Sequence, residues 1–184
     1  MKFQKYMAVG ILGLTMALGF SGCQSENQKN QDAYRKIGIN SMAEGDYDKA
    51  VKSFQKALDT SLGKIGAEEI DICYYKAAAQ FAKKDYDGAI ETYTSLIDYD
   101  KENANAYYLR GSVYLDTDKK DKAFKDYKNA VKYAGREYEI YEGIYENLTN
   151  KGETEEAKNY LKKALDIKPK DGADYAEQGH VYYL

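Results

Sequence analysis

Residues 104–137 read ANAYYLRGSVYLDTDKKDKAFKDYKNAVKYAGRE, and this stretch carries two helical patterns separated by a polar break. In its first half Tyr107, Gly111 and Tyr114 recur at spacings of three or four residues, so they share one face of a helix. Residues 116–120 contain no apolar side chain, which favours a tight connection. The second half then resumes the helical spacing. The stretch therefore predicts two antiparallel helices.

Small residues stand where these two helices would cross. Gly111 and Ala123 occupy the predicted crossing, and a larger side chain there would push the helix axes beyond about 8–10 Å. Tyr114 and Tyr127 are placed to fill the space on either side of the crossing. One such helix pair cannot bury its apolar faces alone, so we expect further pairs to stack against it.

The pattern repeats along the chain. Alanine recurs at intervals of 34 residues, at Ala89, Ala123 and Ala157. The repeated helix pair resembles the tetratricopeptide repeat, a helix–turn–helix unit of this period. The resemblance implies an all-α fold, an α-solenoid of four such repeats plus a terminal helix. The expected segments are a signal peptide (1–22), a lipidated cysteine with a flexible tether (23–30) and the repeat domain (31–184), with repeats at 31–64, 70–103, 104–137 and 138–171, an inserted loop at 65–69 and an end helix at 172–184.

Composition agrees with a helical chain and argues against one class of partner. The 184 residues include one proline, and 31% are charged. The formal net charge is −3, and removal of a segment containing Lys2 and Lys5 would make the chain more acidic. Nucleic-acid binding needs lysine and arginine gathered on one face to neutralise phosphates. We therefore expect no nucleic acid among the partners.

Residues 1–22 resemble a bacterial lipoprotein signal peptide. Lys2 and Lys5 precede an uncharged, largely apolar run at residues 7–20, which is too short to span a bilayer as a helix. The run leads into Phe-Ser-Gly-Cys at residues 20–23, which is similar to a lipobox except that phenylalanine replaces an aliphatic residue. The resemblance implies cleavage before Cys23, lipid attachment to its sulfur and an extracytoplasmic position at a membrane of the bacterial envelope. An ordinary cleaved signal with an incidental cysteine is the alternative.

Catalytic chemistry has little support in the sequence. His180 is the only histidine, so a histidine-based nucleophile pair or a multi-histidine metal site is not expected. Cys73 falls on the predicted packing line of its helix, which favours a buried and unreactive thiol. The sequence has no glycine-rich phosphate loop. We therefore expect neither enzymatic activity nor a cofactor.

The predicted second helix of residues 104–137 is rich in lysine. Asp118, Asp121 and Asp126 interleave with the lysines, which predicts a solvated face whose lysines have acidic partners. A weak attraction to anionic lipid is a further consequence if the tether is short. The lysines concerned are Lys119, Lys120, Lys122, Lys125, Lys128 and Lys132.

The resemblance places a binding site on the concave surface, which the first helices of the repeats line. Tyrosines in the middle of this groove would supply contact area at low entropic cost, and glutamates would make its far end acidic. A protein or peptide partner with apolar anchors and a basic end would fit. The tyrosines could instead only shield the floor of the groove. The expected groove residues are Arg35, Ile39, Met42, Tyr74, Phe81, Tyr108, Ser112, Leu115, Glu139, Glu142 and Glu146, with Ala78 beside Tyr74 and Phe81.

Three functional hypotheses follow. The first is a lipid-anchored scaffold that binds a protein or peptide partner. The second is an assembly factor for a secretion, pilus or outer-membrane complex, which rests on analogy of fold and anchor. The third is a small-ligand receptor or an accessory domain of an enzyme.

Two features near the end of the chain depart from the repeat pattern. Tyr145 stands where the other repeats place a small residue. The terminal segment has Tyr175, Gly179 and Tyr182 in repeat register but ends in Val-Tyr-Tyr-Leu, which is apolar for a capping helix. This end could be buried, could self-associate or could belong to a longer array, and we expect it to be buried.

Overall fold

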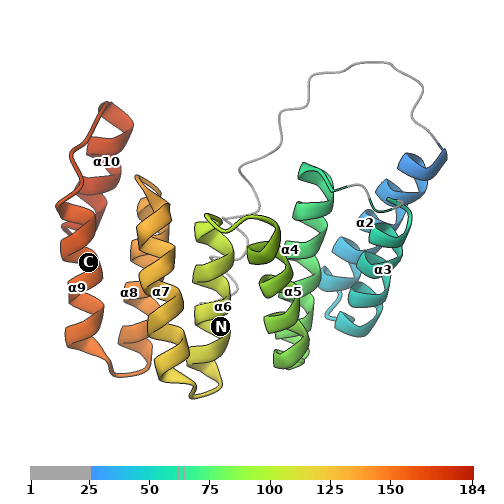
Figure 1. Ribbon diagram of the computed structural model, residues 1–184, viewed down its shortest axis with the longest axis horizontal. Coiled ribbons are helices and arrows are strands. Elements are labelled where there is room, and N and C mark those ends of the chain that lie inside the picture. Colours follow the sequence, from blue (N-terminus) through green and yellow to red (C-terminus); the bar gives the residue numbers. More distant parts are fainter. Residues whose placement is uncertain (1–25, 62, 64) are drawn as a thin grey trace. The chain divides into compact units, whose positions relative to one another are not determined.

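The computed structural model describes residues 26–61, 63 and 65–184 of the chain. Every regular element in these ranges is an α-helix, which confirms the predicted all-α solenoid of paired helices (Figure 1). The predicted signal peptide and Cys23 lie outside the described residues. The helices are α2 (Glu26–Ala43), α3 (Tyr47–Asp59), α4 (Ala67–Ala82), α5 (Tyr86–Tyr99), α6 (Ala104–Asp116), α7 (Lys120–Ala134), α8 (Tyr138–Asn150), α9 (Thr154–Leu165) and α10 (Gly172–Val181).

The chain divides into two compact units within α5. The first unit ends at Leu96 and the second begins at Ile97. The first contains α2, α3, α4 and most of α5, and the second contains α6 to α10. Each unit is described by itself below.

The turns inside the helix pairs share one backbone feature. The residue at the turn adopts a positive φ in every pair: 79° at Gly45, 67° at Lys84, 57° at Asp118 and 82° at Gly152. Glycine adopts this left-handed conformation freely, whereas lysine and aspartate do so with strain. The second helix of each pair then starts two residues later. In the first pair the residue between is the N-cap Asp46, whose side chain accepts a hydrogen bond from the Lys49 backbone N–H at 3.0 Å.

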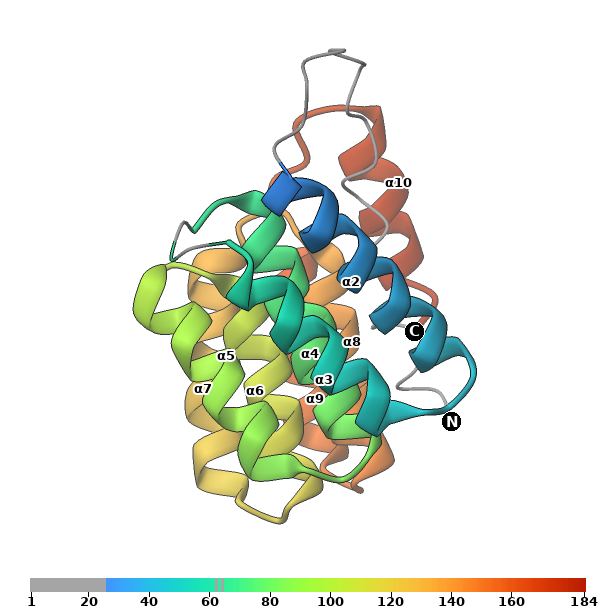
Figure 2. The same cartoon turned by 90° about the vertical axis from the view of Figure 1, so that its right-hand side faces the viewer.

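In the first unit α2 and α3 pack side by side, as Figures 1 and 2 show. Their contact centres on Gly38, where a Cβ would lie 2.5 Å from the Phe54 ring. The helices can therefore approach closely only because residue 38 has no side chain. Phe54 also stacks on Tyr75 of α4 at 5.6 Å between ring centroids, which carries the core from the first pair into the second. The buried residues of the cluster around Phe54 are Ala50, Phe54, Ala57, Ile72 and Ala79.

The second unit repeats this crossing between α6 and α7. A Cβ on Gly111 would lie 2.8 Å from the Tyr127 ring, and Tyr127 is fully buried. Ala123 is likewise fully buried, so the structure confirms the small residues predicted at the crossing. The core continues through Ile144 and Leu148 of α8 to α9.

An ion pair also joins α6 to α7. Arg110 donates to both carboxylate oxygens of Asp126, from Nε at 2.7 Å and from Nη2 at 2.9 Å. The Asp126 side chain is only 4% exposed and that of Arg110 is 15% exposed. The guanidinium carbon of Arg110 lies 5.7 Å from the Tyr107 ring centroid and 5.9 Å from that of Tyr114. The pair is thus enclosed by aromatic rings and largely shielded from water.

Two predicted boundaries differ from the structure. The expected tether reached residue 30, but α2 already begins at Glu26, because Gln28 and Gln31 donate hydrogen bonds to Glu68 and Glu69 of α4 at 2.6 and 2.7 Å. The expected inserted loop is shorter than residues 65–69, because α4 begins at Ala67. Here the Glu69 carboxylate accepts a hydrogen bond from the Gly66 backbone N–H at 2.8 Å.

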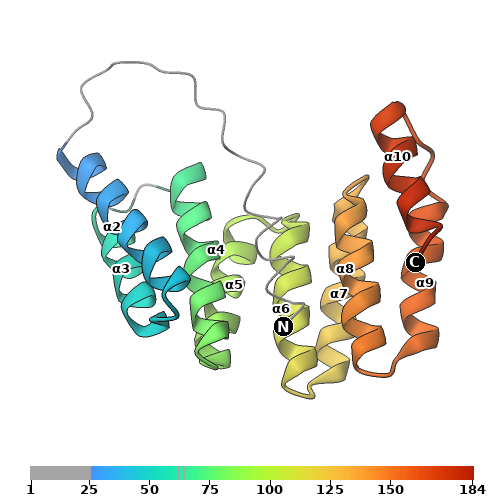
Figure 3. The same cartoon turned by 180° about the vertical axis from the view of Figure 1, so that it is seen from behind.

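Helix α10 ends the second unit and packs on α8 and α9 (Figure 3). Val181 is its one buried residue, whereas Tyr182 is 69% and Tyr183 is 91% exposed. The expectation of a buried end is therefore wrong for both tyrosines. The hydroxyl of Tyr145 donates to the Leu184 carbonyl at 3.0 Å, so the departure at residue 145 gives the segment after α10 a contact that a small residue could not make.

Candidate functional site: the first-helix face and a lysine-lined pocket

In the first unit the predicted groove residues lie mainly in contacts between helices. Arg35 of α2 donates from Nε to the Asp71 carboxylate of α4 at 2.9 Å and stacks over Tyr75 at 5.3 Å. Ile39 and Met42 are partly buried against the core of this unit. Arg35 therefore joins neighbouring first helices, and its charge is already compensated.

The two predicted aromatic groove residues of α4 are half-buried. Tyr74 lies 6.3 Å from Tyr93, and Phe81 lies 5.6 Å from Tyr86, measured between ring centroids. Ala78, predicted beside them, is fully buried. Both rings thus pack against α5 along one edge and keep another edge accessible.

In the second unit three predicted groove residues are buried. Tyr108 is 7%, Ser112 is 2% and Leu115 is 2% exposed. The Tyr108 hydroxyl occupies the space that a Cβ on Gly143 of α8 would need. The prediction placed these side chains toward solvent, but this side of α6 packs against the next first helix, α8. They are therefore not available as a contact surface.

Ser112 belongs instead to a small polar network inside the second unit. Asn147 of α8 donates to Ser112 Oγ at 2.8 Å and to the Tyr127 hydroxyl at 3.4 Å. Ser112 in turn donates to the Tyr108 carbonyl at 2.9 Å. This network links α6, α7 and α8 and satisfies polar atoms that would otherwise be buried without partners.

Helix α10 covers one of the three glutamates predicted at the acidic end of the groove. Glu139 is exposed and Glu146 is partly exposed, whereas Glu142 is 7% exposed and its Oε1 lies 2.9 Å from His180 Nδ1 of α10. The hydrogen bond to Glu142 raises the pKa of His180. Burial raises the pKa of Glu142, and the hydrogen bond with His180 opposes that rise. Glu142 therefore holds α10, and Glu139 and Glu146 remain as accessible carboxylates.

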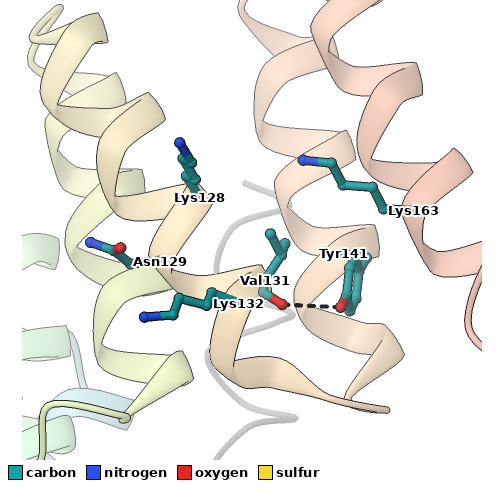
Figure 4. Close-up of a pocket in the computed structure, with 6 residues that line it drawn as sticks. All are labelled: Lys128, Asn129, Val131, Lys132, Tyr141 and Lys163. Atoms are coloured by element: carbon teal, nitrogen blue, oxygen red, sulfur yellow. Dashed lines mark hydrogen bonds between the residues drawn. The ribbon is translucent and has the colours of Figure 1, made fainter.

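A pocket lies on the side of the second unit formed by the second helices (Figure 4). Its volume is about 360 Å³, and α7, α8 and α9 contribute its walls. Figure 4 shows Lys128 of α7 and Lys163 of α9 on its two sides, with Val131 and Tyr141 between them. The six lining residues are Lys128, Asn129, Val131, Lys132, Tyr141 and Lys163.

Hydrogen bonds and ring contacts hold the walls of this pocket in place. The Tyr141 hydroxyl donates to the Val131 carbonyl at 3.2 Å and to the Gly135 carbonyl at 3.4 Å. Lys163 Nζ lies 4.8 Å from the centroid of the Tyr160 ring. Lys132 Nζ donates to the Tyr133 hydroxyl at 2.9 Å. The floor is therefore apolar and aromatic, and the rim carries positive charge.

One of the three acidic partners predicted for the lysines is used elsewhere. Asp126 pairs with Arg110, and Lys120 pairs with Glu153 of the next pair. Among the residues that the structure describes, none of the three pocket lysines forms an ion pair. The sequence analysis did not predict the pocket, because the lysine pattern was considered within one helix. Lys163 belongs to a helix more than thirty residues later in the chain.

Cys73 and the titratable groups give no further site. Cys73 is only half-buried, so the prediction of a buried thiol is corrected, although burial still raises its pKa. Within residues 26–61, 63 and 65–184 no three His, Cys, Asp or Glu side chains gather as metal ligands would. No helix among the described residues is both long and apolar enough to cross a membrane.

The repeated helix pairs with small crossings define a helical-repeat protein, and comparison with known families gives the same class. Sequence models of the tetratricopeptide repeat match residues 35–93, 77–118, 104–136 and 146–171. The chain therefore contains tetratricopeptide repeats, as the sequence pattern predicts.

Solved structures with the same fold include three named proteins. MamA is 26% identical with a TM-score of 0.58, over 75% of this chain and 78% of that one. The pilF protein of Pseudomonas aeruginosa is 17% identical with a TM-score of 0.58, over 86% and 70%. YrrB, described as a TPR protein with an unusual peptide-binding site, is 18% identical with a TM-score of 0.54, over 84% and 75%. No curated protein matches the chain.

Proposed function

We propose that this protein is a lipid-anchored scaffold of the bacterial envelope that binds a segment of a partner protein. The repeats support the binding role, because stacked helix pairs offer extended surfaces to other proteins. YrrB is an example of the same fold with a peptide-binding site. The lipoprotein-like residues 1–23 support the anchor and the extracytoplasmic position.

The lysine-lined pocket of the second unit is the surface that carries this proposal. Its floor combines an aliphatic and an aromatic residue, Val131 and Tyr141, which suits an apolar anchor of a partner. Its rim holds Lys128, Lys132 and Lys163. Lys128 and Lys132 are four residues apart on α7, so their like charges repel by a few tenths of a kcal/mol.

An acidic segment with one apolar or aromatic side chain fits this arrangement best. Its carboxylates would relieve the repulsion between the lysines, and its apolar side chain would enter between α7 and α9. Charge complementarity of this kind mainly raises the association rate and selects the partner. The predicted basic-ended partner would instead contact Glu139 and Glu146 on the first-helix face, and the experiment below separates the two surfaces.

The test is crosslinked capture from native membranes, followed by mass spectrometry. The variant that reverses the charge of Lys128 and Lys163 should lose the partner. A matched control reverses Lys125 and Lys162, which are exposed on the same two helices but do not line the pocket. It changes the net charge by the same amount and should retain the partner.

A third variant, with Glu139→Lys and Glu146→Lys, tests the first-helix face. Loss of the partner only in this variant would overturn the pocket assignment and favour the groove. Equal capture by all three variants would overturn both surfaces. Lipid binding is checked with vesicles that contain anionic lipid. If the unmodified chain binds them and the Lys128 and Lys163 variant does not, while that variant still captures the protein partner, the pocket contacts lipid instead.

The anchor has a test of its own. Cys23→Ala should move the protein from the membrane fraction to the soluble fraction, because two or more acyl chains at about 0.8 kcal/mol per buried CH₂ hold a protein firmly in a bilayer. Cys73→Ala is the matched control and should stay with the membrane. Persistence of the Cys23→Ala variant in the membrane fraction would contradict the lipid anchor.

A further inference from the structure

The first two turns of α2 are helical although they have no apolar core of their own. Residues 26–33 read ENQKNQDA, and Ala33, the one apolar residue among them, is exposed. On α2 the apolar cluster around Phe54 begins only at Tyr34. Asparagine is a weak helix former, and so short a helix is marginal by itself in water. Contacts with a neighbouring helix must therefore hold these two turns.

Those contacts are polar and lie at the first turn of α4. Gln28 donates a hydrogen bond to Glu68 at 2.6 Å, and Gln31 donates one to Glu69 at 2.7 Å. Asp32 adds a hydrogen bond with the Glu68 carboxyl group. Gln28, Gln31 and Asp32 are three or four residues apart, so they share one face of α2. This face docks residues 26–33 on α4.

The contact between Asp32 and Glu68 joins two carboxyl groups. An ionised carboxylate only accepts hydrogen bonds, so this bond exists only while one of the two groups carries a proton. Loss of that proton replaces the hydrogen bond with repulsion between two negative charges. The docking of the first two turns of α2 therefore depends on one shared proton.

The surroundings of Glu68 favour its protonated form. Burial raises the pKa of Glu68 from the ordinary 4.5 to about 7, and the hydrogen bond with Asp32 and the negative charges of Asp32 and Glu69 add to the rise. The positive charge of Arg35 opposes it. Arg35 is already paired with Asp71, to which its Nε donates at 2.9 Å.

We propose that residues 26–33 form a proton-dependent latch on α4. While Asp32 and Glu68 share a proton, the latch is docked, and when both are ionised it detaches. Separate contacts hold the rest of α2, because Lys56 Nζ lies 5.5 Å from the Tyr34 ring centroid and Arg35 pairs with Asp71. Release therefore stops before Tyr34.

The direction of the pH response follows from proton linkage. The docked latch binds the Glu68 proton more tightly than the detached latch, in which this carboxyl group titrates in its ordinary range. The penalty on docking is therefore absent below about pH 4.5 and is complete above about pH 7. The latch loosens as the pH rises through this interval.

The position of the latch gives it a consequence at a membrane, which rests on the lipid anchor proposed above. The chain from Cys23 to Glu26 reaches at most roughly 10 Å, and the chain from Cys23 to Tyr34 reaches roughly 40 Å when fully extended. Release of the latch would thus let an anchored repeat domain stand further from the lipid surface. The latch itself does not require the anchor.

Hydrogen exchange of the full-length chain in a non-ionic detergent tests the latch. After correction for the intrinsic pH dependence of exchange, protection of residues 26–33 should be at least about tenfold lower at about pH 8 than at about pH 5. Residues 50–57 of α3, which include the buried Phe54, are the internal reference and should keep their protection. Protection of residues 26–33 that is unchanged, or higher at the higher pH, would overturn the proposal.

Two substitutions that remove one charge each test the shared proton. Glu68→Gln keeps the shape of the side chain and can donate to Asp32 without titrating, so residues 26–33 should stay protected at about pH 8. Asp32→Asn should reduce the pH dependence in the same way. Glu91→Gln is the matched control, because Glu91 is exposed on α5, and it should respond to pH like the unmodified chain. A pH dependence that persists unchanged in either latch variant would contradict the shared proton, provided that circular dichroism shows an intact fold.

The Cys23→Ala variant separates the latch from the lipid anchor. Its residues 26–33 should respond to pH like those of the unmodified chain, whether or not the variant leaves the membrane fraction. A failed anchor would therefore leave the latch intact. Loss of the pH response in this variant would show that the contacts between α2 and α4 are not sufficient for the latch, and would overturn it.

Discussion

Helix α6 and the segment formed by α10 and its C-cap Tyr182 carry tyrosine, glycine and tyrosine in the same repeat register, but the environments of these residues differ. On α6 the glycine is buried against Tyr127 of α7, and the flanking tyrosines lie against Arg110. On α10 the glycine meets open space, and both tyrosines are more than half exposed. The same sequence pattern thus forms a core in one place and a surface in the other.

The difference shows that a repeat motif specifies a helix face but not what covers it. The α6 face is closed by the next helix of its own pair. Among the described residues no second helix packs over the α10 face, and its tyrosines are exposed. Substitutions at matching positions in the two helices should therefore have opposite consequences.

The largest effect is expected at the ion pair that joins α6 to α7. Asp126→Ala leaves the Arg110 guanidinium largely buried without its carboxylate, which should reduce the free energy of unfolding by about 3 kcal/mol. Urea unfolding followed by circular dichroism would measure the change. Asp121→Ala, on the exposed side of the same helix, should change it by less than about 0.5 kcal/mol. A similar small change for both variants would contradict the importance of the buried pair.

The matched glycines test the comparison directly. Gly111→Ala should lower the free energy of unfolding by about 1–3 kcal/mol, because the new methyl group displaces the buried Tyr127 ring. Gly179→Ala should raise it by up to about 1 kcal/mol, because alanine favours the helix and no described residue is displaced. Thermal and urea unfolding of dilute protein would measure both. The same sign for both substitutions would show that the two faces are equally covered.

The smallest effect concerns the pH dependence of α10 docking. The pKa of His180 is raised by its hydrogen bond to Glu142, and the pKa of Glu142 is raised by burial. The folded state therefore binds protons more tightly than the unfolded state at both groups. The stabilisation from His180 is present below the ordinary histidine pKa of about 6.5 and is lost as the pH rises through the higher folded value.

We accordingly expect α10 to loosen as the pH rises above the ordinary histidine pKa of about 6.5. Hydrogen exchange of residues 172–184, corrected for the intrinsic pH dependence of exchange, should show lower protection at the higher pH. Residues of α6 serve as the internal reference. His180→Gln should flatten the pH dependence of α10, and an unchanged dependence in that variant would assign the effect to other groups.

Much of the fold could be predicted from spacing alone. The interval of 34 residues located the helix pairs, and Gly111 and Ala123 marked a crossing that the structure confirms. Short-range signals were equally informative at Asp46, where an acidic residue before a helix became its cap. Such features depend on residues close in sequence, so the pattern contains them.

The candidate site was less predictable. Tyr108, Ser112 and Leu115 share a helix face that the sequence assigned to solvent, but the next first helix, α8, covers it. The lysine pocket forms because Lys128 of α7 and Lys163 of α9 line the same cavity. The spacing of residues within one helix cannot predict that two separate helices come together in this way. Contacts between neighbouring repeats depend on how the pairs stack, which helical periodicity within one pair does not encode.

The sequence by itself determined the class of fold, the register of its repeats and the residues at the helix crossings, because these follow from periodicity and side-chain size along each helix. The tertiary structure alone decided which faces remain exposed. It buried Tyr108 and Glu142, gathered three lysines around Tyr141 and left the tyrosines of α10 in solvent. The physical reason is that burial depends on which helices pack together, and that packing brings together residues far apart in the chain.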